Sequence, residues 1–573
     1  MNLSRKTKKS IFYTVFAVLL LGSIFSAIKM ILFGFWADDS FLVTMPYRLA
    51  TGEKFFEDLW ETVQFSGVLC AVLEWIYLFV SGTTEGLVIY LRICGVIIHF
   101  IVSIVLFSTL SHFIKREYAL LVVIIFFNMS PKVSAIPEYN NMLIWFTTLS
   151  ICFFVKTYEE GSKKSTCILF SGIFFGFAVL AYPSAVLLVP AYIICFFILD
   201  KKQGIRDCLI FFGICAFMAL VLILYLVITV DTENLIDGIK HTFLGDSTHL
   251  SGITIQGQGV VTSFINGAKT ILLHMLIVLG VACSCTFLWG VLSKKTRVIF
   301  DISLFLNLAI IGAAIESLYC WLWLKESFDI VKIHIPIVAF CGLLAVLFTK
   351  KEKDITEKAL VSAFVLGCLV LFAVAVVSNV PIVQNMGYLQ VAVAFGLPFV
   401  LKRTEGSNII LCSLVALGIC VIVGQGYSVK STPLENNISV MTEKMELGVA
   451  KGVYVTKEYK DILTEQIHEF REYTVPGDRI LVIQNNYTIP AGSLYLENGV
   501  IIAHYNTTST PTYDTNIWDY WNRYNDKIAN VVVVDKAYDD LFMFGEDSMI
   551  YNYIQEYYYL DKSDRKLDFY RRK

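Results

Sequence analysis

The chain has 573 residues, of which 56% are hydrophobic and only 16% are charged. This composition carries more apolar surface than one soluble core can bury, so it excludes an ordinary soluble fold and predicts a protein surrounded by lipid. The formal net charge of -2 provides no general basic field, which argues against nucleic acid as a partner.

The N-terminus predicts a first membrane span rather than a cleaved signal peptide. Four basic residues (Arg5, Lys6, Lys8 and Lys9) precede an apolar stretch that starts at Ile11 and continues past Lys29 to Ala37. This stretch is too long for the apolar region of a secretory signal, and no small-residue cleavage pattern follows it.

Further spans are predicted from apolar runs of about 17 to 25 residues, because backbone polar groups in hydrocarbon must be satisfied within a helix. Thirteen runs qualify: 11–33, 86–110, 117–130, 139–156, 166–182, 183–199, 207–230, 268–292, 298–318, 329–349, 359–378, 386–401 and 408–427. Residues 65–80 are short and contain Glu74, so we expect an interfacial or re-entrant helix there. If this segment crosses the membrane, a weaker span such as 117–130 does not.

Basic residues in alternate loops indicate the orientation. Lys and Arg residues gather at 115–116, 163–164, 201–206, 294–297, 350–353 and 402–403, all on the N-terminal side of the membrane. Because basic loops are retained in the cytoplasm, we expect a multi-pass cell-membrane protein with a cytoplasmic N-terminus. An odd number of spans places the tail after about Tyr427 outside the cytoplasm.

The tail differs in composition from the preceding residues. An amphipathic helix is predicted at 456–474, strands at 479–483 and 531–534, and a helix at 547–557. The predicted fold class is therefore an α-helical polytopic membrane domain over 1–427, with outer loop 34–64, followed by a small exoplasmic α/β domain over 428–573.

Two adjacent carboxylates, Asp38 and Asp39, follow the first span and the aromatic Trp36. Carboxylates near hydrocarbon repel one another and are costly to desolvate, which can raise a pKa toward that of a general base. A solvated helix end beside an aromatic belt is the alternative interpretation.

The acidic pair is followed by a segment with Gly52, Phe55, Phe56, Asp58 and Trp60, and then by the run Leu91-Arg92-Ile93. This arrangement resembles the GT-C superfamily of membrane glycosyltransferases, which includes protein O-mannosyltransferases, aminoarabinose transferases and oligosaccharyltransferases. The layout of thirteen spans with a C-terminal exoplasmic domain is also similar. The resemblance implies a transferase that moves a sugar from a polyprenyl-phosphate lipid to a glycan, protein or lipid acceptor at the outer face.

Site residues follow from this resemblance. Asp39 or Asp38 corresponds to the family's base, and Glu138 to its second acidic residue, although Glu138 suits the N-terminus of the following span equally well. A lipid phosphate needs cations near the outer interface, and the candidates are Arg92, Lys325, Lys332 and His334. Asp58 is a further candidate for binding donor or acceptor. For each cation alone, snorkelling to lipid head groups is the alternative.

No cofactor is expected from the sequence. His241 and His249 with Asp237 or Asp246 can in principle hold a divalent metal, but their spacing matches no helical metal pair, and a loop that covers the acceptor site is favoured. The cysteines show no metal-ligand spacing. A lipid-linked sugar flippase or transporter, and a polysaccharide polymerase or ligase, remain the alternative functions.

Overall fold

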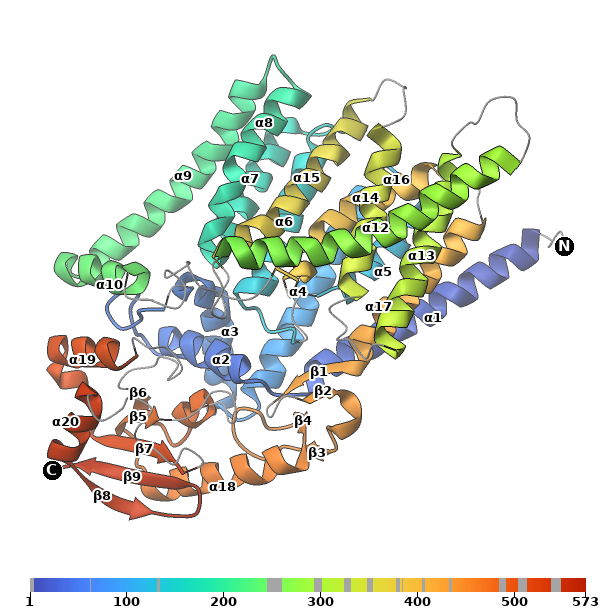
Figure 1. Cartoon of the computed structure of the whole chain (residues 1–573). Helices are drawn as coiled ribbons and strands as arrows, with labels where there is room; N and C mark the ends of the chain where they lie inside the picture. Colours follow the sequence, from blue (N-terminus) through green and yellow to red (C-terminus); the bar gives the residue numbers. More distant parts are fainter. Residues whose placement is uncertain are drawn as a thin grey trace.

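The computed structural model describes most of the chain. The described residues are 5–61, 63–130, 134–244, 260–292, 301–323, 331–347, 354–377, 382–383, 385–403, 408–431, 435–483, 491–502, 513–536 and 548–573. They form a large helical bundle and a smaller C-terminal region with a sheet, which lie at opposite ends of the molecule (Figure 1). This arrangement confirms the predicted fold class of a helical membrane protein with a small C-terminal α/β region.

The helical part is built as follows. Its α-helices are α1 (Arg5–Leu32), α2 (Ala37–Ala50), α3 (Gly67–Ser81), α4 (Leu87–Leu110), α5 (Arg116–Asn128), α6 (Tyr139–Lys156), α7 (Lys164–Ala181), α8 (Val189–Leu199), α9 (Gly204–Thr229), α10 (Thr232–Leu244), α12 (Val260–Leu292), α13 (Ile302–Leu322), α14 (Val331–Leu347), α15 (Ile355–Ala375), α16 (Gln390–Arg403) and α17 (Asn408–Tyr427). Each of the thirteen predicted spans contains one of these helices. Among the described residues, eight helical segments are long and apolar enough to cross a membrane, and three apolar helices are shorter, so thirteen stays a prediction.

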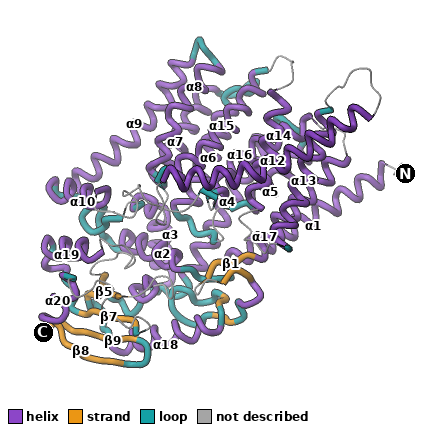
Figure 2. The backbone as a smooth tube through the Cα atoms, in the orientation of Figure 1, coloured by secondary structure: helices purple, strands orange, loops and turns teal. Residues whose placement is uncertain are grey.

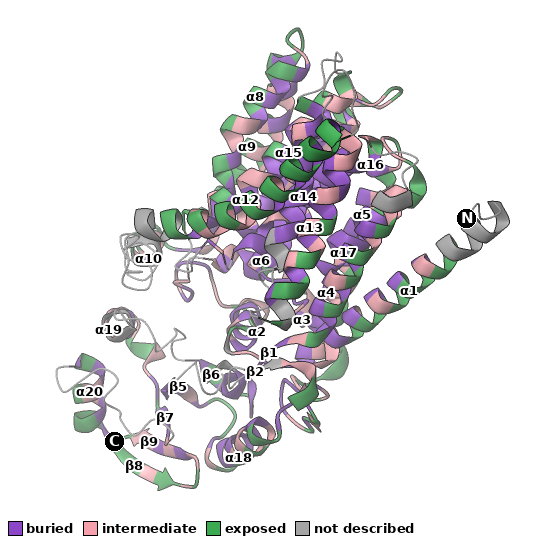
Figure 3. Ribbon diagram, turned by 45° about the vertical axis from the view of Figure 1, so that its right-hand side comes forward, coloured by how far each residue is buried: buried purple, intermediate pink, exposed green. Residues whose placement is uncertain are grey.

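Lipid is the natural surrounding of this bundle. Helices α9 and α12 expose many large apolar side chains, such as Leu220, Leu224, Leu276 and Trp289. Much of the α12 ribbon is coloured as exposed in Figure 3. Exposed apolar surface of this extent is unfavourable in water and favourable in hydrocarbon. The chain is therefore a multi-span membrane protein.

Helix α3 starts and ends beside the C-terminal region. Before it, Trp60 packs edge-on against Tyr520 at a ring-centroid distance of 5.3 Å. After it, the Thr84 hydroxyl donates a hydrogen bond of 2.8 Å to the carbonyl of Leu496. The turn and helix at Gln64–Ser81 are apolar enough for a span, but a helix with both flanks on one region does not separate them by a bilayer. The contacts therefore support the interfacial position expected for 65–80.

The C-terminal region begins with β1 (Ser428–Ser431), directly after α17, and its main sheet has the strand order β6-β5-β7-β9-β8. The strands are β5 (Arg479–Ile483), β6 (Ile501–Ile502), β7 (Val531–Asp535), β8 (Tyr558–Ser563) and β9 (Leu567–Arg572). Strand β5 pairs in parallel with β6 and β7, and β9 runs antiparallel to β7 and β8. Every residue of β7 is buried, because its alternate valines pack in two different hydrophobic clusters, one on each face of the sheet. Figure 2 shows the strands of this sheet gathered at the end of the molecule where the chain terminates.

The helices of this region follow the predicted pattern. Helix α18 (Lys457–Tyr473) and helix α20 (Met549–Tyr557) lie where helices are predicted, and α19 (Tyr513–Arg523) is an addition. Thr456 starts α18 by accepting a hydrogen bond from the amide of Tyr459 at 3.2 Å.

A shared hydrophobic core joins the C-terminal region to the first outer loop. Phe35, Leu42 and Val43 from this loop pack in one cluster with Val449 and Tyr459. The amide of Gly34 also donates a hydrogen bond of 2.8 Å to the carbonyl of Tyr454. The acidic pair, which follows Gly34 within five residues, therefore lies on the same side of the bundle as the C-terminal region.

Candidate functional site

The acidic pair occupies the first turn of α2, where carboxylates complement the helix dipole. Asp39 is buried with 5% of its surface exposed, and its Oδ2 accepts a hydrogen bond of 3.2 Å from the amide of Trp36. Asp38 is exposed on the surface. The two neighbouring carboxylates therefore have different surroundings, because Asp39 is buried and Asp38 is exposed.

Arg92 of α4 fixes the position of Asp39. Its Nη2 donates to Oδ2 of Asp39 at 2.9 Å and to the carbonyl of Gly34 at 2.7 Å, and its Nη1 donates to the carbonyl of Ile31 at 3.2 Å. The side chain is 1% exposed. Arg92 thus ties the end of α1, the start of α2 and the body of α4 together, a task that suits the forked guanidinium.

A second buried arginine, Arg48, organises the rest of the outer loop. Its Nε donates to Glu53 at 2.5 Å, its Nη1 lies 3.4 Å from Oε1 of Glu61, and its Nη2 donates to the carbonyl of Asp58 at 2.7 Å. Burial raises the pKa of Glu61 to about 7, and the charge of Arg48 opposes that rise. The loop is therefore held by a buried network with one carboxyl group that titrates near neutrality.

Asp58 connects this loop to the C-terminal region. Its Oδ2 accepts a hydrogen bond of 2.8 Å from the amide of Lys54, and its Oδ1 forms an ion pair with Lys527. The side chain of Asp58 is 7% exposed. The structure thus places this predicted substrate-binding residue where the outer loop contacts the C-terminal region.

Glu138 is the N-cap of α6. Its carboxylate accepts hydrogen bonds from the amides of Asn140 at 2.9 Å and Asn141 at 2.8 Å, and from the side-chain amide of Asn140 at 2.7 Å. It is buried. This is the helix-capping arrangement that the sequence allowed as the alternative to a catalytic role.

The predicted phosphate-binding cations are not brought together among the described residues. Arg92 is occupied by Asp39 and by the end of α1, and His334 is buried in α14 beside Glu316. Lys332 lies in α14, but its side chain is outside the described part of the chain, as is all of Lys325. A small cavity between α1, α4 and α6, which His99 and Trp145 help to line, has room for about one water molecule.

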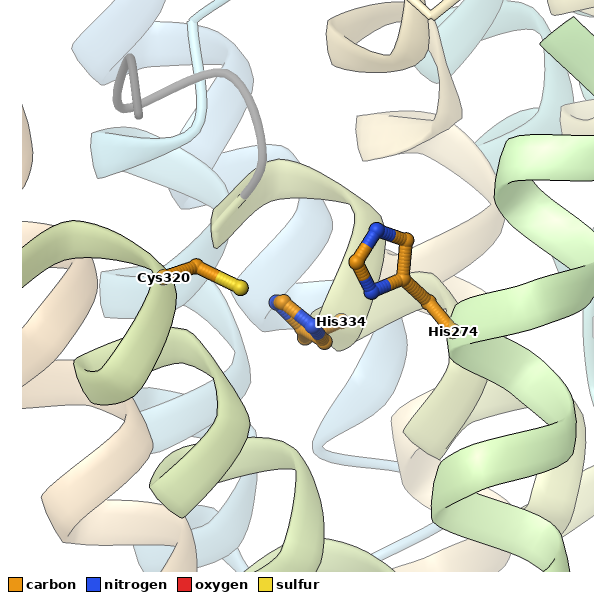
Figure 4. A group of neighbouring side chains, drawn as sticks. All are labelled: His274, Cys320 and His334. Atoms are coloured by element: carbon orange, nitrogen blue, oxygen red, sulfur yellow. The ribbon is translucent and has the colours of Figure 1, made fainter. Parts of the chain in front are cut away.

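The loop predicted as a weak metal candidate lies mostly outside the described residues: Asp246 and His249 are among those left out, and the side chain of His241 is not described. Asp237 of α10 pairs with Arg523 of α19. A different group was missed in the sequence: His274, Cys320 and His334 offer ligand atoms that all lie within 4.8 Å of one another (Figure 4). The sequence contains one signal for this group, because two predicted spans each hold an ionisable residue: His274 in 268–292 and Glu316 in 298–318.

Comparisons with known proteins agree with the sequence resemblance. Residues 67–228 match the family described as dolichyl-phosphate-mannose-protein mannosyltransferase, a range that includes Arg92 and Glu138 and begins after the acidic pair. This match confirms the predicted resemblance to membrane glycosyltransferases. No curated protein matches the chain.

Two solved structures show the extent of similarity in fold. The oligosaccharyltransferase AglB from Archaeoglobus fulgidus, in complex with an inhibitory peptide and a dolichol-phosphate, is 12% identical with a TM-score of 0.44, over 98% of this chain and 74% of that chain. ArnT from Cupriavidus metallidurans, bound to undecaprenyl phosphate, is 11% identical with a TM-score of 0.43, over 99% and 98%.

Proposed function

We propose that this chain is an integral-membrane glycosyltransferase that moves a sugar from a polyprenyl-phosphate carrier to an acceptor at the outer face of the membrane. The observation that carries the proposal is the acidic pair after the first membrane helix, in which Asp38 is exposed and Asp39 is held by Arg92. The match of residues 67–228 to a mannosyltransferase family supports the same reaction class.

The proposed step is an inverting displacement at the anomeric carbon. The acceptor hydroxyl forms a bond to this carbon while the bond from the carbon to the phosphate oxygen breaks, and the phosphate leaves with the electron pair. Asp38 takes the proton of the hydroxyl, as a general base within hydrogen-bond reach does. Asp39 and Arg92 position the first turn of α2, and so act through Asp38.

The lipid phosphate needs a cation, which we assign to Lys332 or Lys325. Arg92 is less suited than the sequence suggested, because its donors already serve Asp39 and three backbone carbonyls. Glu138 and Asp58 are proposed to support the site by holding α6 and the outer loop in place.

The proposal includes a sidedness. Residues 1–427 form the membrane domain with a cytoplasmic N-terminus, and residues 428–573 form an extracytoplasmic domain that covers the acidic loop. The basic loops of the sequence support this orientation, and the contacts of Asp58 and Gly34 with the C-terminal region place the acidic loop beside that region.

The test is transfer by the full-length protein reconstituted in liposomes. Dolichyl-phosphate mannose and undecaprenyl-phosphate sugars, each labelled in the sugar, are supplied with a cell-envelope fraction as the source of acceptor. We expect label to leave one of these lipids in the wild type but not in Asp38→Asn. The control Asp526→Asn, which removes an exposed acid from the C-terminal region, should transfer label like the wild type. Equal transfer by Asp38→Asn and wild type contradicts the assignment, and no transfer from any polyprenyl-phosphate sugar contradicts the function.

A further inference from the structure

Three membrane helices bring a cluster of polar side chains together away from the acidic loop. His274 comes from the first half of α12, Cys320 from the end of α13, and His334 from the start of α14 (Figure 4). The two imidazole rings meet edge to face with 5.2 Å between their centroids. Ionisable side chains inside apolar helices are costly and are retained where they have a function.

Glu316, one turn before Cys320 on α13, completes the cluster. Its Oε1 lies 2.7 Å from Nδ1 of His274, and its Oε2 lies 3.3 Å from Nε2 of His334. A carboxylate that hydrogen-bonds one nitrogen of a histidine fixes the ring and leaves the other nitrogen as a metal ligand. This arrangement is found around protein-bound zinc and orients the imidazole toward the ion.

His334 supplies an independent sign of a missing occupant. Its side chain is completely buried, and within the described residues its Nδ1 has no hydrogen-bond partner, while its Nε2 has the 3.3 Å contact with Glu316. Buried polar atoms without partners are rare because each loses its hydration without compensation, and a bound ion is one of the recognised explanations.

We propose that His274, Cys320 and His334 bind a zinc ion that joins α12 to α13 and α14, with Glu316 orienting the histidine rings. Two imidazoles and a thiolate suit zinc, with a water molecule as the fourth ligand, and the ligand atoms of a tetrahedral site stand about 3.3–3.8 Å apart. Ligand atoms already within 4.8 Å reach that separation by small side-chain rotations. On binding, the Cys320 thiol loses its proton to water and the thiolate bonds to the ion.

The ion gives α12 a fixed attachment. This helix exposes most of its surface and, among the described elements, packs chiefly on α13 and α14. A link through three side chains from three helices holds α12 without a large apolar contact. The inference does not depend on the proposed transferase reaction.

The test is the metal content of the full-length protein, purified without chelator, stripped with a chelator and reloaded with zinc chloride. Elemental analysis by mass spectrometry is expected to find about one zinc per chain in the wild type, and at least tenfold less in Cys320→Ser and His334→Ala. Matched controls are Cys341→Ser, a buried thiol of α14, and His99→Gln, a buried histidine of α4, which keep the zinc. Glu316→Gln is expected to weaken zinc affinity about 10- to 100-fold.

A ligand variant can lose metal by unfolding, so the folded wild type provides a second test. After loading with cobalt(II), a tetrahedral site with a thiolate shows intense visible bands and sulfur-to-cobalt charge transfer, and Cys341→Ser keeps both. A wild-type protein that binds neither zinc nor cobalt, or a Cys320→Ser protein with the wild-type metal content and spectrum, overturns the proposal.

Discussion

Asp39 and Arg92 form a buried ion pair of 2.9 Å between the first turn of α2 and the second turn of α4. Because Arg92 also caps the last carbonyls of α1, this one pair fixes where the chain leaves the membrane helix and where the acidic loop begins. The position of Asp38 depends on it through the shared helical turn.

Removing Arg92 should therefore destabilise the fold. Arg92→Ala leaves the carboxylate of Asp39 buried without its charge partner, and breaking such a pair costs about 3–5 kcal/mol. We expect a clear drop in the thermal unfolding midpoint in detergent, and little rescue by Arg92→Lys, which supplies a point charge instead of a fork. The double variant Arg92→Met with Asp39→Asn should lose less stability than the sum of the losses in Arg92→Met alone and Asp39→Asn alone. Strict additivity would contradict the pairing.

The buried carboxyl group of Glu61 predicts a pH dependence of stability. Its folded-state pKa of about 7 lies above its ordinary value, so the folded state holds the proton more tightly than the unfolded state does. This contribution is fully present below about pH 4.5 and is lost as the pH rises through 7, with a slope of at most about 1.4 kcal/mol per pH unit. Thermal unfolding from pH 5 to 8 should show a smaller slope in Glu61→Gln. If the wild type and Glu61→Gln show the same slope, Glu61 is not the source of the pH dependence.

The contact of Lys527 with Asp58 predicts that the C-terminal region protects the outer loop. Lys527→Ala removes the charge partner of a buried carboxylate, at a cost of about 1–3 kcal/mol, and should loosen residues 51–61. Hydrogen exchange by mass spectrometry is expected to be faster in that loop. Lys562→Ala, which changes an exposed lysine on β8, is the control and should leave exchange unchanged. Unchanged exchange in Lys527→Ala would mean that the loop is held without this contact.

Glu74 of α3 should be replaceable with a gain in stability. It is fully buried, and neither carboxylate oxygen has a hydrogen-bond partner among the described residues. An apolar side chain of similar length avoids the desolvation cost, so Glu74→Met should raise the unfolding midpoint. A lower midpoint would indicate that the carboxyl group has a partner of its own.

Much of the fold could be predicted from the sequence, because a lipid-facing helix must be an apolar run of sufficient length. Each predicted span contains a helix, and β5, β7, α18 and α20 lie at the expected residues. The hairpin of β8 and β9 was missed because β8 is a mostly exposed edge strand and both strands carry charged side chains, such as Lys562 and Asp568.

The sequence identifies candidate site residues but does not show how they pair. The motif identified Asp38, Asp39 and Arg92, yet a linear pattern cannot show that Arg92 is 53 positions away from the carboxylate that it holds. The zinc ligands come from three helices with one residue each, so no local spacing marks them.

The most direct test of the account compares sugar transfer by Asp38→Asn and wild type, with the unfolding midpoint measured on the same preparations. A general base contributes about 10²- to 10⁴-fold to rate, so Asp38→Asn should lose at least about 100-fold in turnover with an unchanged midpoint. Asp39→Asn should lower both quantities, because Asp39 is bound to Arg92. An Asp38→Asn protein that transfers sugar at the wild-type rate would contradict the central claim.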